Sequence, residues 1–129
     1  MKTINTSSDP VHEAVLAHKR LDVYQVALQF LEIAVSLSKR LPRTKGQLGD
    51  QLSRASEGIV LCIAEGTGAE FRSADQKRYF RSARGSALEC SAILDVCRLK
   101  GIGSHEVLAE GRGYLVRIVQ MLTKLAHRP

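Results

Sequence analysis

The stretch that decides the fold runs from Gln51 to Glu89 and reads QLSRASEGIVLCIAEGTGAEFRSADQKRYFRSARGSALE. Apolar residues recur in it every three or four positions, which is the period of an amphipathic helix. A glycine-rich segment, residues 66–68, interrupts this period, and glycine commonly follows the last residue of a helix. The stretch therefore predicts two long helices, the first ending near Glu65, that meet at a corner.

The same period extends in both directions and predicts four helices in total. We expect them over residues 21–40, 48–65 and 74–100, and from a cap at Ser104 to about His127. Leu41-Pro42 should end the first, because the residue before a proline disfavours helical backbone angles. Ser73 and Gln76 have the spacing of a capping box, which should start the third.

The connections between these helices are short, so neighbouring helices should run antiparallel. No alternating strand pattern of useful length occurs. We therefore expect an all-α fold, an antiparallel up-down-up-down four-helix bundle over residues 19–129 that follows a polar N-terminal arm, residues 1–18. The spacing also predicts the residues that face the core: Tyr24, Ala27, Leu28, Leu31, Ala34, Val35 and Ser38; Leu52, Ala55, Ile59 and Ile63; Phe80, Ala83, Ala87, Cys90, Leu94 and Cys97; and Leu108, Leu115, Ile118, Leu122 and Leu125.

Charged and small residues lie beside the predicted core faces. A partly buried charge is costly unless it is paired, and Arg54 and Glu89 lie near the middle of adjacent helices, so we expect them to pair. Glu65, at a helix end, should lie far from Glu89, which argues against paired acid–base catalysis. Gly85 inside a helix costs about 1 kcal/mol relative to Ala. Together with Ser86, it indicates close backbone packing, either within the chain or against another subunit.

The composition limits the kinds of function. The chain has 129 residues, a net charge of +6 and three cysteines, which we expect to be buried, reduced thiols. It has no apolar run long enough to span a bilayer, so we expect a cytoplasmic protein with no membrane partner. The Glu-x-x-His spacing of a metal site in a helix bundle is absent. We expect no metal, no cofactor, no catalytic residues and no enzymatic activity.

The basic residues are the clearest surface feature. Two groups are candidate nucleic-acid contacts: Arg72, Lys77, Arg78, Arg81 and Arg84, and Lys39, Arg40, Arg43 and Lys45. They form either an ordinary solvated face or a groove that follows a phosphate backbone. Most aromatic residues fall on core faces, so we expect no platform for base stacking. Binding of RNA or DNA should then be sensitive to salt and weakly sequence-specific.

Several motifs together resemble a known bacterial family. They are Gln51-Leu52, Arg54-Ala55, Ile59, Ile63-Ala64-Glu65-Gly66, Gly68, Gly85-Ser86 and Glu89, with Leu21-Asp22-Val23-Tyr24-Gln25 and Leu41-Pro42 nearer the start. In this order they resemble the 23S ribosomal RNA intervening-sequence proteins, over about residues 19–126. The motifs mainly concern packing, so they identify fold and assembly more directly than function.

The resemblance implies a four-helix bundle that often assembles as a homopentamer and has no established enzymatic activity. It implies similarity to the accessory variability protein of diversity-generating retroelements, a basic pentamer that partners a reverse transcriptase and nucleic acid. Many family members are encoded within inserts in ribosomal RNA genes, which suggests an association with RNA.

The chain departs from the family pattern at several positions. Cys62 stands where Asn is usual, Ser53 where a second Arg is common, and Ala69-Glu70 where a basic pair is often seen. These departures remove positive charge near the motif. We expect a homo-oligomeric bundle that binds RNA or other nucleic acid through basic surfaces; the alternative is an interaction or scaffold module that docks a partner protein.

Overall fold

The protein is a bundle of four α-helices. The computed structural model describes residues 16–127, which form a short 3-10 helix, η2 (Ala17–Arg20), and the helices α1 (Asp22–Ser38), α2 (Leu48–Gly68), α3 (Ala74–Lys100) and α4 (His105–Ala126). Within this range there is no strand. The all-α prediction is therefore confirmed. Residues 1–15, most of the expected N-terminal arm, lie outside the described range.

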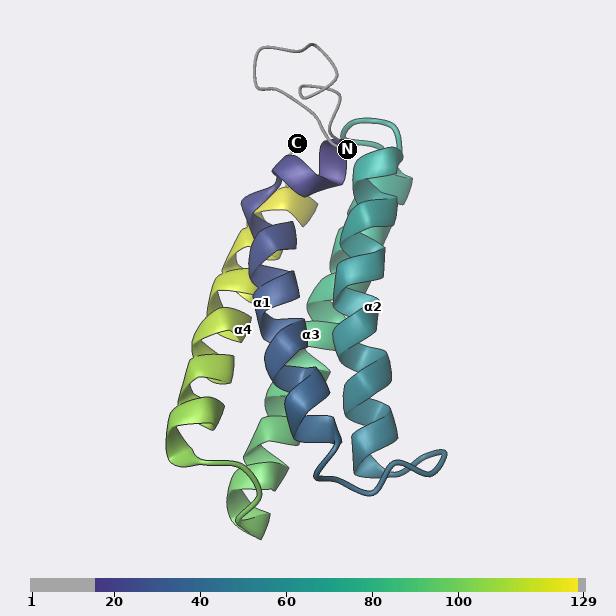
Figure 1. Cartoon of the computed structure of the whole chain (residues 1–129). Coiled ribbons are helices and arrows are strands. Elements are labelled where there is room, and N and C mark those ends of the chain that lie inside the picture. Colours follow the sequence, from purple (N-terminus) through teal and green to yellow (C-terminus); the bar gives the residue numbers. More distant parts are fainter. Residues whose placement is uncertain (1–15, 128–129) are drawn as a thin grey trace, which may run out of the picture.

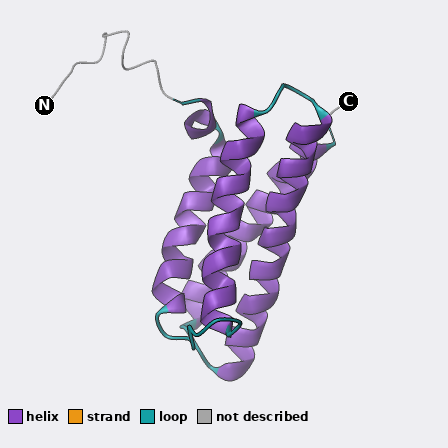
Figure 2. Ribbon diagram, turned by 90° about the vertical axis from the view of Figure 1, so that its right-hand side faces the viewer, coloured by secondary structure: helices purple, strands orange, loops and turns teal. Residues whose placement is uncertain are grey.

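The four helices lie side by side and alternate in direction (Figures 1 and 2). Each packs against two neighbours: α1 against α2 and α4, and α3 against α2 and α4. One end carries η2, the α2–α3 turn and the end of α4, and we call it the corner end. The other carries the α1–α2 and α3–α4 connections, and we call it the loop end (Figure 1). No helix in the described part is long and apolar enough to cross a membrane.

The interior is apolar along its whole length, and the predicted core face of α3 is buried at every position, from Phe80 to Cys97. The core face of α1 differs from the prediction. Leu28 and Val35 are 37% and 44% exposed, whereas Phe30 and Leu37 are buried. Helix α1 carries two overlapping apolar stripes, and its buried stripe is rotated from the expected one by somewhat less than a quarter of a turn, so that Ala27, Ala34 and Ser38 are buried as predicted.

Ser73 caps the start of α3 as expected, but the return hydrogen bond of the predicted capping box goes to Arg72 and not to Ser73. The Ser73 hydroxyl accepts a hydrogen bond from the backbone N–H of Gln76 at 3.1 Å. The Gln76 amide oxygen accepts from the backbone N–H of Arg72 at 2.8 Å, and its nitrogen donates to the carbonyl of Gly66 at 3.0 Å. Ser104 caps α4 similarly, accepting from the N–H of Val107 at 3.1 Å. Gln76 thus ties the end of α2 to the start of α3.

The glycine-rich segment is not the turn that the sequence suggested. Helix α2 continues to Gly68, and neither Gly66 nor Gly68 has a positive φ. Gly66 is buried because α3 approaches it: a Cβ atom there would lie 2.7 Å from Cε1 of Phe80. The left-handed residue in this turn is instead Arg72, with φ 60°. The glycine at 66 therefore serves helix packing.

Candidate nucleic-acid interface

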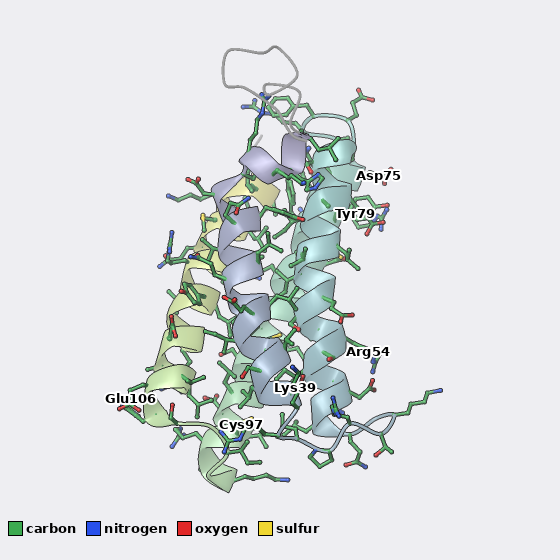
Figure 3. All side chains as sticks on the ribbon, in the orientation of Figure 1. Lys39, Arg54, Asp75, Tyr79, Cys97 and Glu106 are labelled. Carbon is green, nitrogen blue, oxygen red and sulfur yellow. The ribbon has the colours of Figure 1, made fainter. Side chains whose placement is uncertain are left out.

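The candidate basic residues form two separate groups. Arg72, Lys77, Arg78, Arg81 and Arg84 lie on the α2–α3 turn and the first turns of α3, and we call them the corner-end cluster. Lys39, Arg40, Arg43 and Lys45 lie on the α1–α2 connection, and we call them the loop-end cluster. Figure 3 shows Tyr79 toward one end of the bundle and Lys39 toward the other. Because α3 has 27 residues, the ends are about 40 Å apart.

Part of the corner-end cluster is engaged within the chain. Arg78 lies 3.5 Å from the carboxylate of Asp75 and stacks on Tyr79, 4.5 Å from the ring centroid. Its interaction with Tyr79 raises the pKa of the guanidinium, so Arg78 stays charged. Arg84 donates from Nε to the hydroxyl of Thr123 at 2.8 Å, which ties α3 to α4.

The rest of the cluster has unused hydrogen-bond donors. Within residues 16–127, neither Lys77 nor Arg81 forms an ion pair or a side-chain hydrogen bond. They are four residues apart on α3, so they lie on one face of the helix. Arg81 is exposed and Lys77 is half-buried. These two cations are the members of the cluster best placed to donate hydrogen bonds to phosphate oxygens.

The loop-end cluster is exposed, and none of its four side chains has an ion-pair partner within the described residues. Its connection is shaped by backbone contacts: Asp50 accepts from the N–H of Gly46 at 3.0 Å, and Gly49 donates to the carbonyl of Pro42 at 2.7 Å. The first of these hydrogen bonds is the main reason that the pKa of Asp50 is lowered. A carboxylate therefore lies beside this cluster and opposes binding of an anion.

The expected Arg54–Glu89 ion pair does not form. Arg54 pairs instead with Asp50, one turn away on α2, at 3.3 Å, and its side chain is 70% exposed. Figure 3 shows Arg54 on the outer side of the bundle. Arg54 and Glu89 do line one polar surface pocket of about 220 Å³. They are neighbours, but an exposed arginine needs no partner across the helices, and a carboxylate on its own helix is easier to reach.

Gly85 does not allow close packing within the chain. It is exposed, and a Cβ atom added to it would meet nothing within 4 Å. The close approach of α2 to α3 occurs at Gly58 instead, where a Cβ would lie 3.3 Å from Oγ of Ser86. Of the two explanations for Gly85, internal packing is wrong and a subunit contact stays a prediction. Glu65 is an exposed residue inside α2, and it does not close the helix.

The cysteines are free thiols. Cys90 and Cys97 are buried and Cys62 is half-buried. Burial raises the pKa of Cys90 to about 12, and also raises the pKa values of Cys62 and Cys97, so all three are poor nucleophiles. In the described part of the chain, no group of three or more His, Cys, Asp or Glu side chains is arranged to hold a metal ion.

The sequence interpretation missed two surface residues. Phe71 is 68% exposed at the corner end, and the sequence, which places it between two predicted helices, predicts no role for it. Arg112 lies in a surface groove of about 260 Å³ between α3 and α4, beside the exposed Leu88 and Val116. Its Nη1 atom is buried without a hydrogen-bond partner among the described residues. Phe71 had a signal in the sequence, because it lies between two helices and on neither core stripe.

Comparison with known proteins identifies relatives by family and by fold. The family model described as 23S rRNA-intervening sequence protein matches residues 19–124. A solved structure of a protein with unknown function, from the S23 ribosomal protein family of Bacteroides thetaiotaomicron VPI-5482, is similar with a TM-score of 0.72. It shares 21% identity, over 82% of this chain and 99% of that chain, which supports the fold alone. Among curated proteins, no match was found.

Proposed function

Because the chain belongs to the 23S rRNA-intervening sequence protein family, we propose that it is a non-enzymatic, homo-oligomeric, cytoplasmic bundle that binds RNA. The corner-end cluster is the proposed contact surface. The observation that carries the proposal is the pair Lys77 and Arg81, two neighbouring cations on α3 that have no partner within the described residues.

Three members of the corner-end cluster, Lys77, Arg78 and Arg81, lie within the first turns of α3. Arg78 stays charged and pairs with Asp75, whereas Lys77 and Arg81 have no carboxylate partner among residues 16–127. The net charge of +6 favours approach of any polyanion. Phosphate contacts of this kind supply affinity and carry no sequence information. The proposed binding is therefore sensitive to salt and directed at RNA structure.

The experiment compares two variants with the same change in net charge. The corner-end variant carries Lys77→Glu, Arg78→Glu and Arg81→Glu, and the loop-end variant carries Lys39→Glu, Arg40→Glu and Arg43→Glu. Affinity for a labelled RNA hairpin with a single-stranded loop is measured by fluorescence anisotropy at about 50 mM and about 200 mM salt. The corner-end variant is expected to lose binding, and the loop-end variant to keep most of it. Equal losses, or no binding by the unmodified protein at low salt, would contradict the proposal.

A second function, docking of a protein surface, is favoured by the groove between α3 and α4. Its exposed apolar side chains, Leu88 and Val116, flank the buried Nη1 of Arg112. A buried guanidinium N–H without an acceptor is costly, so Arg112 would gain by turning Nη1 outward to a carboxylate or carbonyl of a docked surface. Sedimentation velocity tests the case in which the partner is another copy: Val116→Glu should then produce a smaller assembly. An unchanged assembly would show that this groove is not a contact between copies of the chain. The groove would then dock a different protein or none.

A further inference from the structure

The corner end carries an aromatic ring on its surface. Phe71 lies in the α2–α3 turn and is 68% exposed, whereas Phe30 and Phe80 are buried. The guanidinium of Arg72 lies over the Phe71 ring, 4.9 Å from its centroid. An exposed ring next to cations is the arrangement on which unpaired nucleic-acid bases stack.

The Phe71 ring forms one wall of a pocket, which we call the corner pocket. Its volume is about 210 Å³, and it lies between η2, the α2–α3 turn and the end of α4. Leu21, Phe80 and Leu125 form apolar walls, and Thr67 and Gln76 add polar atoms. Drug-sized ligands occupy pockets of about 300–1,000 Å³, so this smaller one suits a single ring system.

The polar side chains of the pocket, Thr67 and Gln76, each form hydrogen bonds within the chain and keep further hydrogen-bonding capacity. The Thr67 hydroxyl donates to the carbonyl of Ala64 at 2.8 Å, which leaves its oxygen as an acceptor. The Gln76 side-chain nitrogen donates one hydrogen to the carbonyl of Gly66 at 3.0 Å, which leaves a second hydrogen. One acceptor and one donor beside an aromatic wall match the edge of a nucleobase.

The backbone at Arg72 is held in a conformation that is unfavourable for arginine. Its φ of 60° is in the left-handed region, which residues other than glycine rarely adopt. The hydrogen bond from its N–H to Gln76 at 2.8 Å fixes this conformation. The turn thereby holds the Arg72 guanidinium over Phe71. Lys124 and Asp22 both line an adjoining pocket, which shares Leu21 and Leu125 with the corner pocket. One cation therefore lies near the corner pocket on each of two sides, and the second has a carboxylate in the same lining.

We propose that the corner pocket binds one unpaired nucleobase, stacked on Phe71, while Arg72 and Lys124 contact the flanking phosphates. The inference rests on the proposed RNA binding and narrows its ligand to single-stranded or looped segments, because bases in a duplex are stacked on each other and cannot enter. The positively charged rim distinguishes this ligand from an apolar peptide side chain, which would gain nothing from it.

The test measures binding of three RNA probes by fluorescence anisotropy. They are an unpaired strand of about 12 nucleotides, a strand of equal length with abasic sites throughout, and a blunt duplex. The unmodified protein should bind the unpaired strand most tightly. Phe71→Ala should weaken that binding roughly fivefold to 150-fold, the range for loss of one stacked base, and leave the abasic strand unaffected. Arg72→Ala should weaken both.

Two further variants test whether the aromatic ring of Phe71 itself is needed. The chain contains no tryptophan, so Phe71→Trp introduces a single reporter, whose fluorescence the unpaired strand should quench and the abasic strand should not. Phe71→Leu keeps an apolar side chain and removes the ring, so it should bind as weakly as Phe71→Ala. Circular dichroism checks that each variant folds. We expect all of them to fold, because Phe71 is exposed and contributes little to the core.

The outcomes separate the two proposals. Equal binding of the unpaired and abasic strands, unchanged by Phe71→Ala, would overturn the pocket assignment while salt-sensitive binding of RNA still stood. Full affinity in Phe71→Leu, or tighter binding of the duplex than of the unpaired strand, would also overturn it. Absence of binding to all three probes at low salt would overturn the proposed RNA binding together with the pocket.

Discussion

Gly66→Ala tests how closely α2 approaches α3. The added Cβ would lie 2.7 Å from Cε1 and 2.9 Å from Cδ1 of Phe80, where carbon atoms prefer about 3.5–4.0 Å. Phe80 is 2% exposed, so its ring has little space in which to move away. Overpacking of this kind costs roughly 1–3 kcal/mol. Alanine recovers about 0.5–1 kcal/mol over glycine within a helix.

The net expectation is a loss of about 1 kcal/mol in the free energy of unfolding. For a domain of this size, that corresponds to a fall of about 4 °C in Tm. The assay is thermal unfolding followed by circular dichroism, together with denaturant titration to show that the m-value is unchanged.

Gly113→Ala is the matched control, because it makes the same substitution inside α4, at an exposed position where a Cβ meets no atom of the described residues within 4 Å. It should raise stability by about 0.5–1 kcal/mol. A Gly66→Ala protein as stable as the unmodified one, or equal effects of the two substitutions, would refute the packing account. Phe80→Leu should rescue Gly66→Ala partly, with a coupling of at least about 0.5 kcal/mol in a double-mutant cycle.

Three further predictions follow from the same contacts. Ser73→Ala removes the cap of α3 and should lower the free energy of unfolding, measured in urea, by about 1 kcal/mol. An unchanged free energy of unfolding would mean that the contacts of Gln76 alone hold the α2–α3 turn. Arg54→Ala should cost less than Ser73→Ala in the same titration, because its ion pair with Asp50 is exposed; a larger loss would restore a role for Glu89. Burial raises the pKa of Cys90 from 9.0 to about 12, so the folded state binds a proton that the unfolded state releases above about pH 9. The stabilisation from Cys90 should therefore be complete below pH 9 and decline between about pH 9 and pH 12. Cys90→Ala should make the free energy of unfolding fall less steeply over this range. The same fall in both proteins would show that Cys90 does not cause it.

Much of the fold follows from periodicity alone. The α3 core face, from Phe80 to Cys97, and the caps at Ser73 and Ser104 are local patterns, and the structure confirms them. The core face of α1 is different, because two apolar stripes overlap on one helix. Only the positions of α2 and α4 decide that Phe30 turns inward while Val35 stays exposed.

The candidate site depends on facts that no local pattern contains. The sequence predicted a helix end at Gly66 and close packing at Gly85, but it is Gly66 that faces a ring on the neighbouring helix. Arg54 was predicted to pair across the helices, yet its partner Asp50 is on its own helix. Phe71 was assigned to a turn, and its contacts with Arg72 and the corner pocket appear only when η2 and α4 are placed around it.

The salt dependence of RNA binding tests the central claim most directly. Each phosphate contact contributes about −0.7 to −0.9 to the slope of log K against log salt concentration, so contacts from Lys77 and Arg81 should be visible individually. The unmodified protein should show a steep negative slope, and Lys77→Ala with Arg81→Ala should reduce its magnitude by about 1.4 to 1.8. A slope near zero, or the same slope in both proteins, would contradict binding of RNA through the corner-end cluster.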